Sequence, residues 1–152
     1  RVASLLELGA GFHPELTGRE NIYLNSSLLG YTRKEVDRLF DSILEFAEIG
    51  DFIEAPLRTY STGMVARLGF AVATCVRPDI LLVDEVLSVG DSRFQEKCLA
   101  RMNLFQEQGT TIVIVSHNME TIKNFCSRAL WLDQGQAGAI GSVSEVVASY
   151  TG

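Results

Sequence analysis

The chain has 152 residues, of which 47% are hydrophobic and 21% are charged, and this composition excludes an intrinsically disordered protein. Its net charge of −6 argues against nucleic acid as the main partner. The length suits one domain, and no apolar run approaches the ~18 residues that span a membrane.

The first half of the chain has mainly the pattern of helices. A short strand is predicted over residues 2–8. Thr17 and Thr32 are each followed three positions later by a glutamate, which is the pattern of a capping box at a helix start. A third helix follows the sequence Ser-Thr-Gly at 61–63, and Pro78 is expected to end it, because a residue before proline avoids the helical conformation.

The second half alternates between strands and helices. Strands are predicted at 80–83, 111–115 and 129–132, with helices between them, and Gly109 is expected to end the first of these helices. The sequence Asp-Gln-Gly-Gln at 133–136 predicts a turn into an antiparallel strand. Ser142 and Glu145 predict one more capping box. The pattern thus predicts a mostly helical first half and an α/β second half.

Charged and polar side chains follow two of the predicted strands. Asp84 and Glu85 come directly after an apolar strand, and Ser116 and His117 follow the next one. If these strands are parallel neighbours, their tips lie on one edge of the sheet and the side chains converge. Asp84 could then hold Mg²⁺ through water, and Glu85 could orient a water for attack on phosphorus. In the alternative interpretation Asp84 and His117 cap local structure, and Glu85 is a solvated surface acid.

The turn before the third helix, Tyr60 to Met64, is a second candidate site. A helix N-terminus attracts anions through its free N–H groups and its dipole. Ser61 adds a hydroxyl donor, and Gly63 permits close approach of a ligand to the backbone. The alternative is an ordinary N-cap with a flexible glycine.

The three cysteines, Cys75, Cys98 and Cys126, lie far apart in apolar helical patterns. Their number and spacing predict reduced thiols in a core, with one reactive thiol as the alternative. No paired Cys or Cys/His spacing indicates a metal site.

In this order and spacing, the 60–64 turn, the strand ending in Asp84 and Glu85, the segment Ser88 to Asp91, and His117 resemble the nucleotide-binding domain of ABC transporters. The resemblance covers nearly the whole chain. It implies a partial P-loop NTPase fold of the RecA-like type, an α/β fold with a parallel sheet. Residues from about 15 to 77 would form the inserted α-helical subdomain that carries the signature motif. Residues 1–14 and 78–152 would form the core.

The resemblance also implies roles for particular residues. Ser61, Thr62, Gly63 and Met64 correspond to the signature motif, which would touch the γ-phosphate held by a partner subunit. Asp84 ends the Walker B strand and would bind Mg²⁺ through water. Glu85 resembles the catalytic glutamate, and His117 the switch histidine. Ser88 and Asp91 belong to the D-loop. Thr62 and Met64 depart from the commonest signature.

The segment from Leu5 to Ile22 narrows the resemblance to ATPases that export O-antigen, other surface polysaccharides or teichoic acids. The usual Q-loop glutamine is absent; Glu7 or Leu8 falls near its place, and Glu7 is favoured. The resemblance implies a homodimer of two nucleotide-binding domains and transmembrane permease subunits as partners. The localisation it implies is peripheral, on the cytoplasmic face of a bacterial inner or plasma membrane.

No G-x-x-x-x-G-K-[ST] phosphate loop occurs in the 152 residues, and the chain begins at Arg1 rather than at a methionine. We therefore expect it to be the later part of a longer domain, with weak or no binding of ATP and Mg²⁺, and no activity, when alone. One alternative is a shortened, non-catalytic interaction module or half of a split ATPase site. Another is an ABC-type ATPase of DNA repair or chromosome structure, but the coiled-coil or zinc insertions of that group are not seen.

Overall fold

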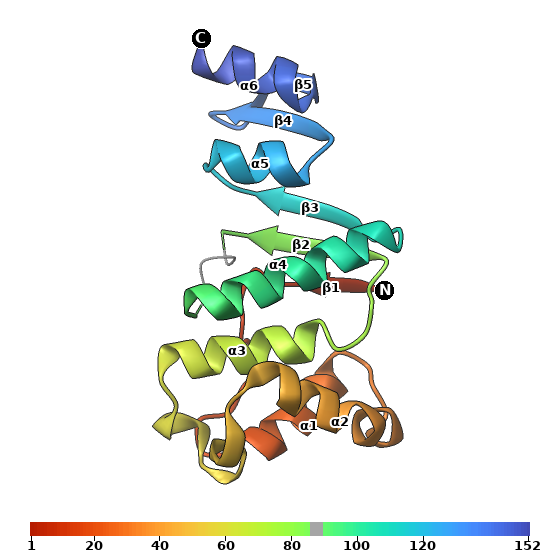
Figure 1. The fold of residues 1–152 in the computed structure, drawn as a ribbon, viewed down its shortest axis with the longest axis vertical. Helices are drawn as coiled ribbons and strands as arrows, with labels where there is room; N and C mark the ends of the chain where they lie inside the picture. The colour runs from red at the N-terminus through yellow and green to blue at the C-terminus, as the bar shows by residue number, and fades with distance from the viewer. Residues whose placement is uncertain (86–89) are drawn as a thin grey trace. The chain divides into compact units, whose positions relative to one another are not determined.

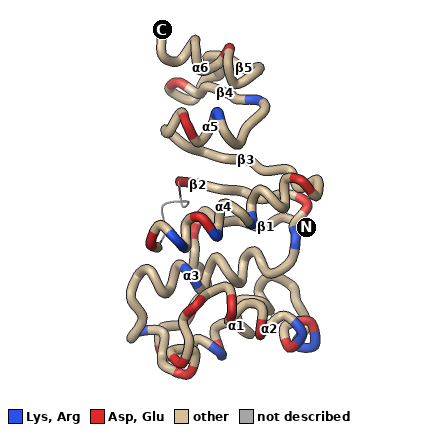
Figure 2. Tube along the Cα trace, viewed as in Figure 1, with Lys and Arg blue, Asp and Glu red and all other residues tan. Residues whose placement is uncertain are grey.

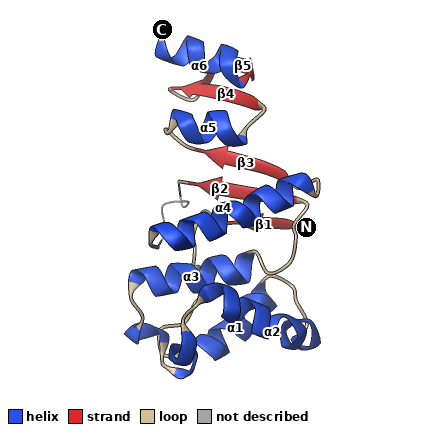
Figure 3. Cartoon of the chain, in the orientation of Figure 1, coloured by secondary structure: helices blue, strands red, loops and turns tan. Residues whose placement is uncertain are grey.

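A computed structural model describes residues 1–85 and 90–152 of the chain. These residues form two compact units, Arg1–Val113 and Ile114–Gly152, which are described separately. Helices and strands follow one another as drawn in Figures 1 and 3. In the first unit the elements are β1 (Val2–Ser4), α1 (Gly18–Leu28), α2 (Arg33–Ala47), the 3-10 helices η1 (Gly50–Glu54) and η2 (Leu57–Thr59), α3 (Thr62–Ala73), β2 (Ile80–Asp84), α4 (Ser92–Glu107) and β3 (Thr111–Val115), which continues into the second unit.

The starts of α1 and α2 are set by the capping boxes that the sequence predicts. Thr17 Oγ1 accepts the Glu20 N–H at 3.1 Å, and Glu20 in return accepts the Thr17 N–H at 2.8 Å. The same reciprocal pair joins Thr32 and Glu35 at the start of α2. Each box satisfies N–H groups that a helix start otherwise leaves without a partner. Both predicted helix starts are confirmed.

Helix α2 is amphipathic and packs by its apolar face. Val36, Phe40, Ile43 and Phe46 recur at intervals of three or four residues and are buried. Phe46 stacks on Phe70 of α3, with ring centroids 5.6 Å apart. The three helices α1, α2 and α3 pack against one another at one end of this unit (Figure 1).

The strands of the first unit form a sheet in the order β1-β2-β3. β1 runs parallel to β2 with Ala3 opposite Leu81, and beyond β1 the Leu5 N–H continues the pairing to Leu82 O at 2.8 Å. Leu81 and Val83 are almost completely buried, at 0% and 1% exposure. The apolar run before Asp84 is therefore a strand, as predicted, with Leu81 and Val83 on its buried face, and it pairs in parallel with β1.

The strand predicted over residues 2–8 is shorter in the structure and ends at Ser4. The Ser4 hydroxyl oxygen accepts the Leu6 N–H at 3.3 Å, and the Ala10 N–H then bonds to Glu7 O in a turn. A serine that bonds to backbone two residues on competes with strand pairing. The apolar pattern alone does not reveal this competition.

Helix α3 also ends earlier than predicted, at Ala73 rather than close to Pro78. The Thr74 N–H and the Thr74 hydroxyl both donate to Phe70 O, at 3.0 and 2.7 Å. Thr74 itself has left the helical conformation, with φ −112° and ψ 13°. The threonine therefore ends the helix before the proline restricts it.

The second unit contains α5 (Met119–Phe125), β4 (Arg128–Asp133), β5 (Gln136–Ser142) and α6 (Val143–Thr151). β4 and β5 pair antiparallel, and the turn between them uses left-handed backbone at Gln134 and Gly135, with φ 46° and 81°. This is the turn that the sequence predicts. Ser142 and Glu145 form the predicted capping box of α6.

None of the helices within the described ranges combines the length and the apolar character that crossing a lipid bilayer requires.

Candidate functional site

The predicted signature residues lie at the N-terminus of α3. Ser61 is the N-cap: its backbone is extended, with φ −67° and ψ 159°, and its hydroxyl oxygen accepts the Met64 N–H at 3.2 Å. Ser61 and Thr62 are exposed, and Gly63 and Met64 are half-buried. The hydroxyl hydrogen of Ser61 is not used in this bond, so it can donate outward together with the free N–H groups of the first turn.

Gly63 is not required by the fold of its own chain. Its backbone does not lie in the left-handed region. Apart from its own helix and neighbours, a Cβ placed there would meet nothing nearer than Ser61 Oγ, at 3.9 Å. The absence of a side chain here is compatible with close approach of an anion to the first turn of α3.

Tyr60 fixes the turn to the 3-10 helix η1. It is buried, and its hydroxyl donates to Phe52 O in η1. A Cβ on Gly18, the first residue of α1, would collide with this hydroxyl. Burial raises the pKa of Tyr60, so the phenol stays a neutral donor. The pairing of Tyr60 with Gly18 was not predicted, because the two residues are far apart in the sequence.

The two acids at the tip of β2 differ in environment. Asp84 is the last residue of the strand and is half-buried, whereas Glu85 lies in the bend that follows and is exposed. Figure 2 shows acidic positions at this end of β2. The residues after the bend, 86–89, lie outside the described ranges. They include Ser88, so the predicted D-loop role of this serine stays a prediction.

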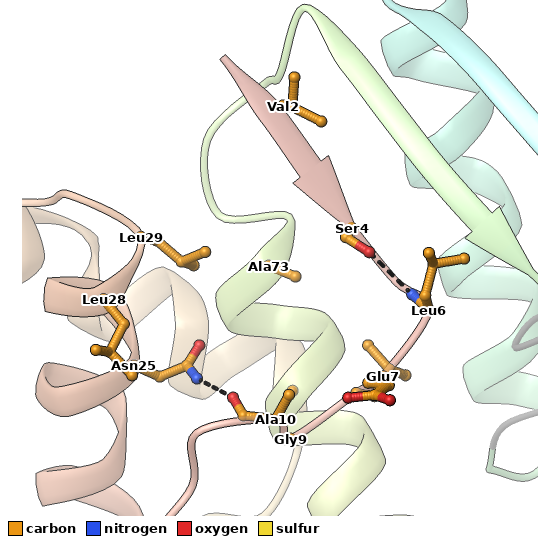
Figure 4. A pocket seen from close by; sticks show the side chains of 12 residues that line it. Val2, Ser4, Leu6, Glu7, Gly9, Ala10, Asn25, Leu28, Leu29 and Ala73 are labelled. Atoms are coloured by element: carbon orange, nitrogen blue, oxygen red, sulfur yellow. Dashed lines mark hydrogen bonds between the residues drawn. The ribbon is translucent and has the colours of Figure 1, made fainter.

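Glu7 follows β1 on the same sheet edge at which Asp84 ends β2. The Leu5 N–H bonds to Leu82 O, and each acid comes two residues later in its own segment. Glu7 lines an open pocket of about 460 Å³ between the end of β1 and helix α1. Figure 4 shows the side chains that line this pocket. Asn25 of α1 holds the far side of the turn by donating to Ala10 O at 2.7 Å.

The turn that contains Glu7 also packs against α3, the helix that begins with the predicted signature residues. A Cβ on Gly69 of α3 would lie 2.8 Å from the Gly9 backbone nitrogen and 3.3 Å from Leu8 Cβ. Gly69 therefore lets α3 touch the backbone of the turn directly. The sequence analysis did not single out this glycine; an isolated glycine inside a helical pattern was the available signal.

Asp91, the other residue of the predicted D-loop, caps α4 and binds Arg67 of α3. Its Oδ1 accepts the Phe94 N–H at 2.9 Å, and its Oδ2 accepts from Arg67 at 2.6 Å. The bond from Phe94, helped by the Arg67 charge, holds the pKa of Asp91 below its usual value. Arg67 lies one turn beyond the signature residues, so it joins that helix to Asp91. The sequence analysis missed Arg67.

His117 lies between β3 and α5, in the second unit, and is exposed. It is not the cap of α5. Asn118 is the N-cap, and its side-chain oxygen accepts N–H groups from Glu120 and Thr121 at 2.9 and 3.2 Å. The capping alternative for the histidine is therefore wrong. Its convergence with Asp84 and Glu85 stays a prediction.

The model of the ABC transporter family matches residues 2–88. An O-antigen export system ATP-binding protein, RfbB of Klebsiella pneumoniae, is 53% identical over 150 residues, which is 99% of this chain and 61% of that protein. The RfbB protein of Myxococcus xanthus is 53% identical over 99% of this chain and 34% of its own length. TagH of Bacillus cereus, a teichoic acids export ATP-binding protein, is 46% identical over 97% of this chain and 27% of its own length.

Two solved structures match the fold. One is an ATP-binding subunit of an ABC transporter, with a TM-score of 0.82, 21% sequence identity, and coverage of 99% of this chain and 62% of that one. The other is a dimeric ATP-binding cassette in a post-hydrolysis state with ADP and Pi, with a TM-score of 0.72, 24% identity, and coverage of 94% and 63%. They confirm the predicted α/β fold as part of a P-loop NTPase domain. The chain spans about three fifths, or less, of the length of the relatives it matches.

Proposed function

The chain belongs to the ABC transporter family, and from this we propose that it forms part of the ATP-binding, ATP-hydrolysing subunit of an exporter. The exported substrate would be a cell-surface polysaccharide such as O-antigen or teichoic acid. Relatives named for O-antigen and teichoic acid export align with 97–99% of the chain at 45–53% identity, which supports this substrate class. Specificity for one glycan is not part of the proposal.

The observation that carries the proposed ATPase activity is the acid pair at the tip of buried strand β2. A half-buried Asp84 beside an exposed Glu85 gives two carboxylates with different tasks. Glu85 would orient and polarise the water that attacks the γ-phosphate. His117 would donate a hydrogen bond to that phosphate, in which case the strand tips of β2 and β3 serve one site.

The donor set at this edge fits Mg²⁺. Among the described residues, no group of three or more acids, histidines or cysteines could hold a metal ion by itself. Mg²⁺ needs no such group, because it keeps several waters and binds through one or two carboxylates and the substrate phosphates. Asp84 would hold it through water. When bound, the ion neutralises charge on the phosphates.

The signature turn would act on a nucleotide held by a second subunit. Ser61, Thr62, Gly63 and Met64 present a hydroxyl and free N–H groups at a helix N-terminus. Ser61 and Thr62 are exposed, which supports contact in trans. We propose a homodimer of nucleotide-binding domains. Asp91 and Ser88 would link the two ATP sites, with Ser88 in the segment outside the described residues.

The Glu7 turn is the proposed Q-loop. It packs against α3 at Gly69, so a movement of the turn would displace this helix, which carries the signature residues. We propose that transmembrane permease subunits bind near this turn and the helical subdomain, residues of about 15 to 77. The protein would then be peripheral, on the cytoplasmic face of a bacterial inner or plasma membrane.

The test of this function is Glu85→Gln in the complete ATP-binding subunit. Glutamine keeps the shape of the side chain but is a far weaker base, so ATP binding should persist while kcat falls on the order of 10²- to 10³-fold. Glu107→Gln, at the exposed end of α4, is the matched control and should leave kcat unchanged. Normal turnover in the Glu85 variant would remove the glutamate from catalysis.

A second experiment tests the non-catalytic alternative. Residues 1–152 contain no G-x-x-x-x-G-K-[ST] loop, which supplies much of the binding energy for nucleotide phosphates in this fold. Calorimetry should therefore detect no micromolar affinity of residues 1–152 for Mg-ATP. Micromolar binding would contradict this expectation. A complete subunit that neither binds nor hydrolyses ATP would favour an interaction module.

A further inference from the structure

Three helices of the first unit meet at a cluster of aromatic rings. Phe46 of α2, Phe70 of α3 and Phe94 of α4 have ring centroids 5.6 to 6.3 Å apart. All three side chains are buried. Because packed interiors are close to crystalline density, a shift of one helix is transmitted to the other two. The cluster joins the helix that carries the signature turn to the helix that Asp91 caps.

A group of charged side chains covers this cluster, with Glu48 at its centre. Glu48 lies 3.2 Å from Lys97 Nζ and within 4 Å of the guanidinium groups of Arg93 and Arg67. Arg67 in turn binds Asp91 at 2.6 Å. We call these five residues the Glu48 network. Figure 2 shows acidic and basic positions side by side where α4 begins.

The cations of the network are held in place by more than charge. Lys97 Nζ also donates to Phe46 O at 2.9 Å, and it lies 4.6 Å from the centroid of the Phe46 ring. The Arg67 guanidinium lies 4.9 Å from the centroid of the Phe94 ring, and its side chain is 19% exposed. Such contacts with ring faces and helix carbonyls fix the direction of long side chains. The network therefore connects the end of α2 to α3 and α4 in one geometry.

The backbone of Glu48 is unusual. It lies in the left-handed region, with φ 52° and ψ 43°, where it ends α2. Glycine is the favoured residue for this position, because a Cβ makes left-handed backbone unfavourable. Among the described residues with φ of this kind, only Glu48 and Gln134 are not glycine. The end of a helix does not by itself require a side chain at this left-handed position. The contacts of the Glu48 carboxylate explain why a glutamate rather than a glycine is found there.

We propose that Glu48 is a positioning residue for ATP turnover. Its carboxylate holds Arg67 and Lys97, so the signature turn at the start of α3 and Asp91 at the start of α4 keep a fixed relation to the end of α2. Glu48 itself touches no reacting atom. The inference rests on the proposed ATPase function and adds to it a control point outside the residues that contact nucleotide.

The test uses Glu48→Gly in the complete ATP-binding subunit. Glycine relieves the left-handed backbone but removes the carboxylate, so it separates stability from positioning. The thermal midpoint should be equal to or above that of the wild type. The kcat should fall about tenfold, because small misplacements of groups around the phosphate are costly, while KM for ATP changes less than about twofold.

Glu45→Gln is the matched control. Glu45 is an exposed glutamate of the same helix, three residues earlier, and its substitution should change neither midpoint nor kcat. Glu48→Gln keeps the strained backbone and a side-chain oxygen for Lys97, so its kcat should lie between those of the wild type and Glu48→Gly.

The outcomes separate this inference from the proposed function. If the wild type hydrolyses ATP, Glu85→Gln lowers turnover as proposed and Glu48→Gly turns over normally, the inference alone is overturned. A Glu48→Gly protein that loses thermal stability and turnover together assigns Glu48 a structural role and also overturns it. A wild type without ATPase activity, or with turnover unaffected by Glu85→Gln, overturns both.

Discussion

The two compact units differ in how they bury their side chains. The first unit has a core of completely buried residues such as Leu5, Ile22, Leu68 and Phe94. It also buries a polar group, Asn21, which is fully hydrogen-bonded. In the second unit the buried apolar side chains are Val143, Val146 and Val147 of α6, whereas the hairpin leaves Leu130, Leu132 and Ile140 exposed at 49%, 63% and 68%.

This difference indicates where substitutions should matter. Burial of apolar area and satisfied polar groups provides most of the free energy that a substitution can remove. The candidate site residues of the first unit, at α3 and at the tip of β2, are therefore attached to a well-packed support. Substitutions in the β4–β5 hairpin should remove less free energy of unfolding. Substitutions matched between the two units can test this difference.

The largest effect is expected for Asn21→Ala. The Asn21 side chain donates to the carbonyls of His13, Leu16 and Thr17 and accepts the His13 N–H, at 2.7 to 3.2 Å. Its removal leaves several of these groups without a partner in a part-buried place, so the free energy of unfolding should fall by about 3 kcal/mol. Urea denaturation measures the loss.

Tyr23→Phe is the control for this prediction. Tyr23 lies on the same helix, and its hydroxyl donates to Asp37 at 2.7 Å on the surface. Removing an exposed hydrogen bond should change stability by no more than about 0.5 kcal/mol. Equal losses in the two variants would contradict the importance of the buried amide.

A smaller loss is expected for Gly69→Ala. The new methyl group would meet the Gly9 backbone nitrogen at 2.8 Å, and backbone cannot yield as easily as a side chain. Such overpacking should reduce the free energy of unfolding by about 2 kcal/mol, measured in urea. If the contact did not matter, alanine would instead stabilise the helix by about 1 kcal/mol, so the sign of the change decides the question.

In the second unit, Val146→Ala should cost about 1.5 kcal/mol, because Val146 is 4% exposed but packs within a small apolar cluster. Leu132→Ser, on the exposed face of the hairpin, should change the free energy of unfolding by less than about 0.5 kcal/mol. Thermal or urea unfolding of the two variants gives the comparison. A larger loss at Leu132 than at Val146 would show that the hairpin face is covered in the protein as it exists.

The smallest effect concerns the thiols, and it also contrasts the two units. Burial raises the pKa of Cys98 to about 12, and it raises the pKa of half-buried Cys126 as well. At pH 8, iodoacetamide should therefore label Cys98 on the order of tenfold or more slowly than Cys126, as mapped by mass spectrometry.

The stability contribution of the Cys98 thiol has a defined direction with pH. The folded state retains the proton, whereas an unfolded thiol loses it near its ordinary value of 9.0. The stabilisation that comes from keeping this thiol protonated is therefore complete below pH 9. It is lost as pH rises from 9 through about 12. Cys98→Ala should show a weaker decline of stability above pH 9 than the wild type. An identical decline would contradict the raised pKa.

The features that could be predicted from sequence depend on residues close together in the chain. The capping boxes at Thr17 and Thr32 and the Gln134-Gly135 turn are set by contacts over two to four positions, and all are confirmed. The order and spacing of the motifs along the chain resemble one family, and this resemblance implied the α/β fold. The boundary of β1 was wrong, and the bond from the Leu6 N–H to the Ser4 hydroxyl at that boundary is a contact that the apolar pattern does not reveal.

The features that were missed depend on pairs that only the fold brings together. Arg67 and Asp91 are 24 residues apart, and Glu48 and Lys97 are 49 apart. Each of these side chains is of a type that normally faces solvent, so its identity carries no sign of a partner. Likewise, no local sequence pattern predicts that α2 ends at a glutamate rather than at a glycine.

The open space around Gly63 has a consequence for experiments that score every substitution at every position. Because neither the conformation nor the packing of the chain demands a glycine there, a screen for solubility or protease resistance should accept alanine at position 63. If the proposed export function and signature role hold, a screen for growth that depends on surface glycan should reject it. Positions at which two such maps diverge would outline the surface that a bound nucleotide occupies, without a ligand ever being seen.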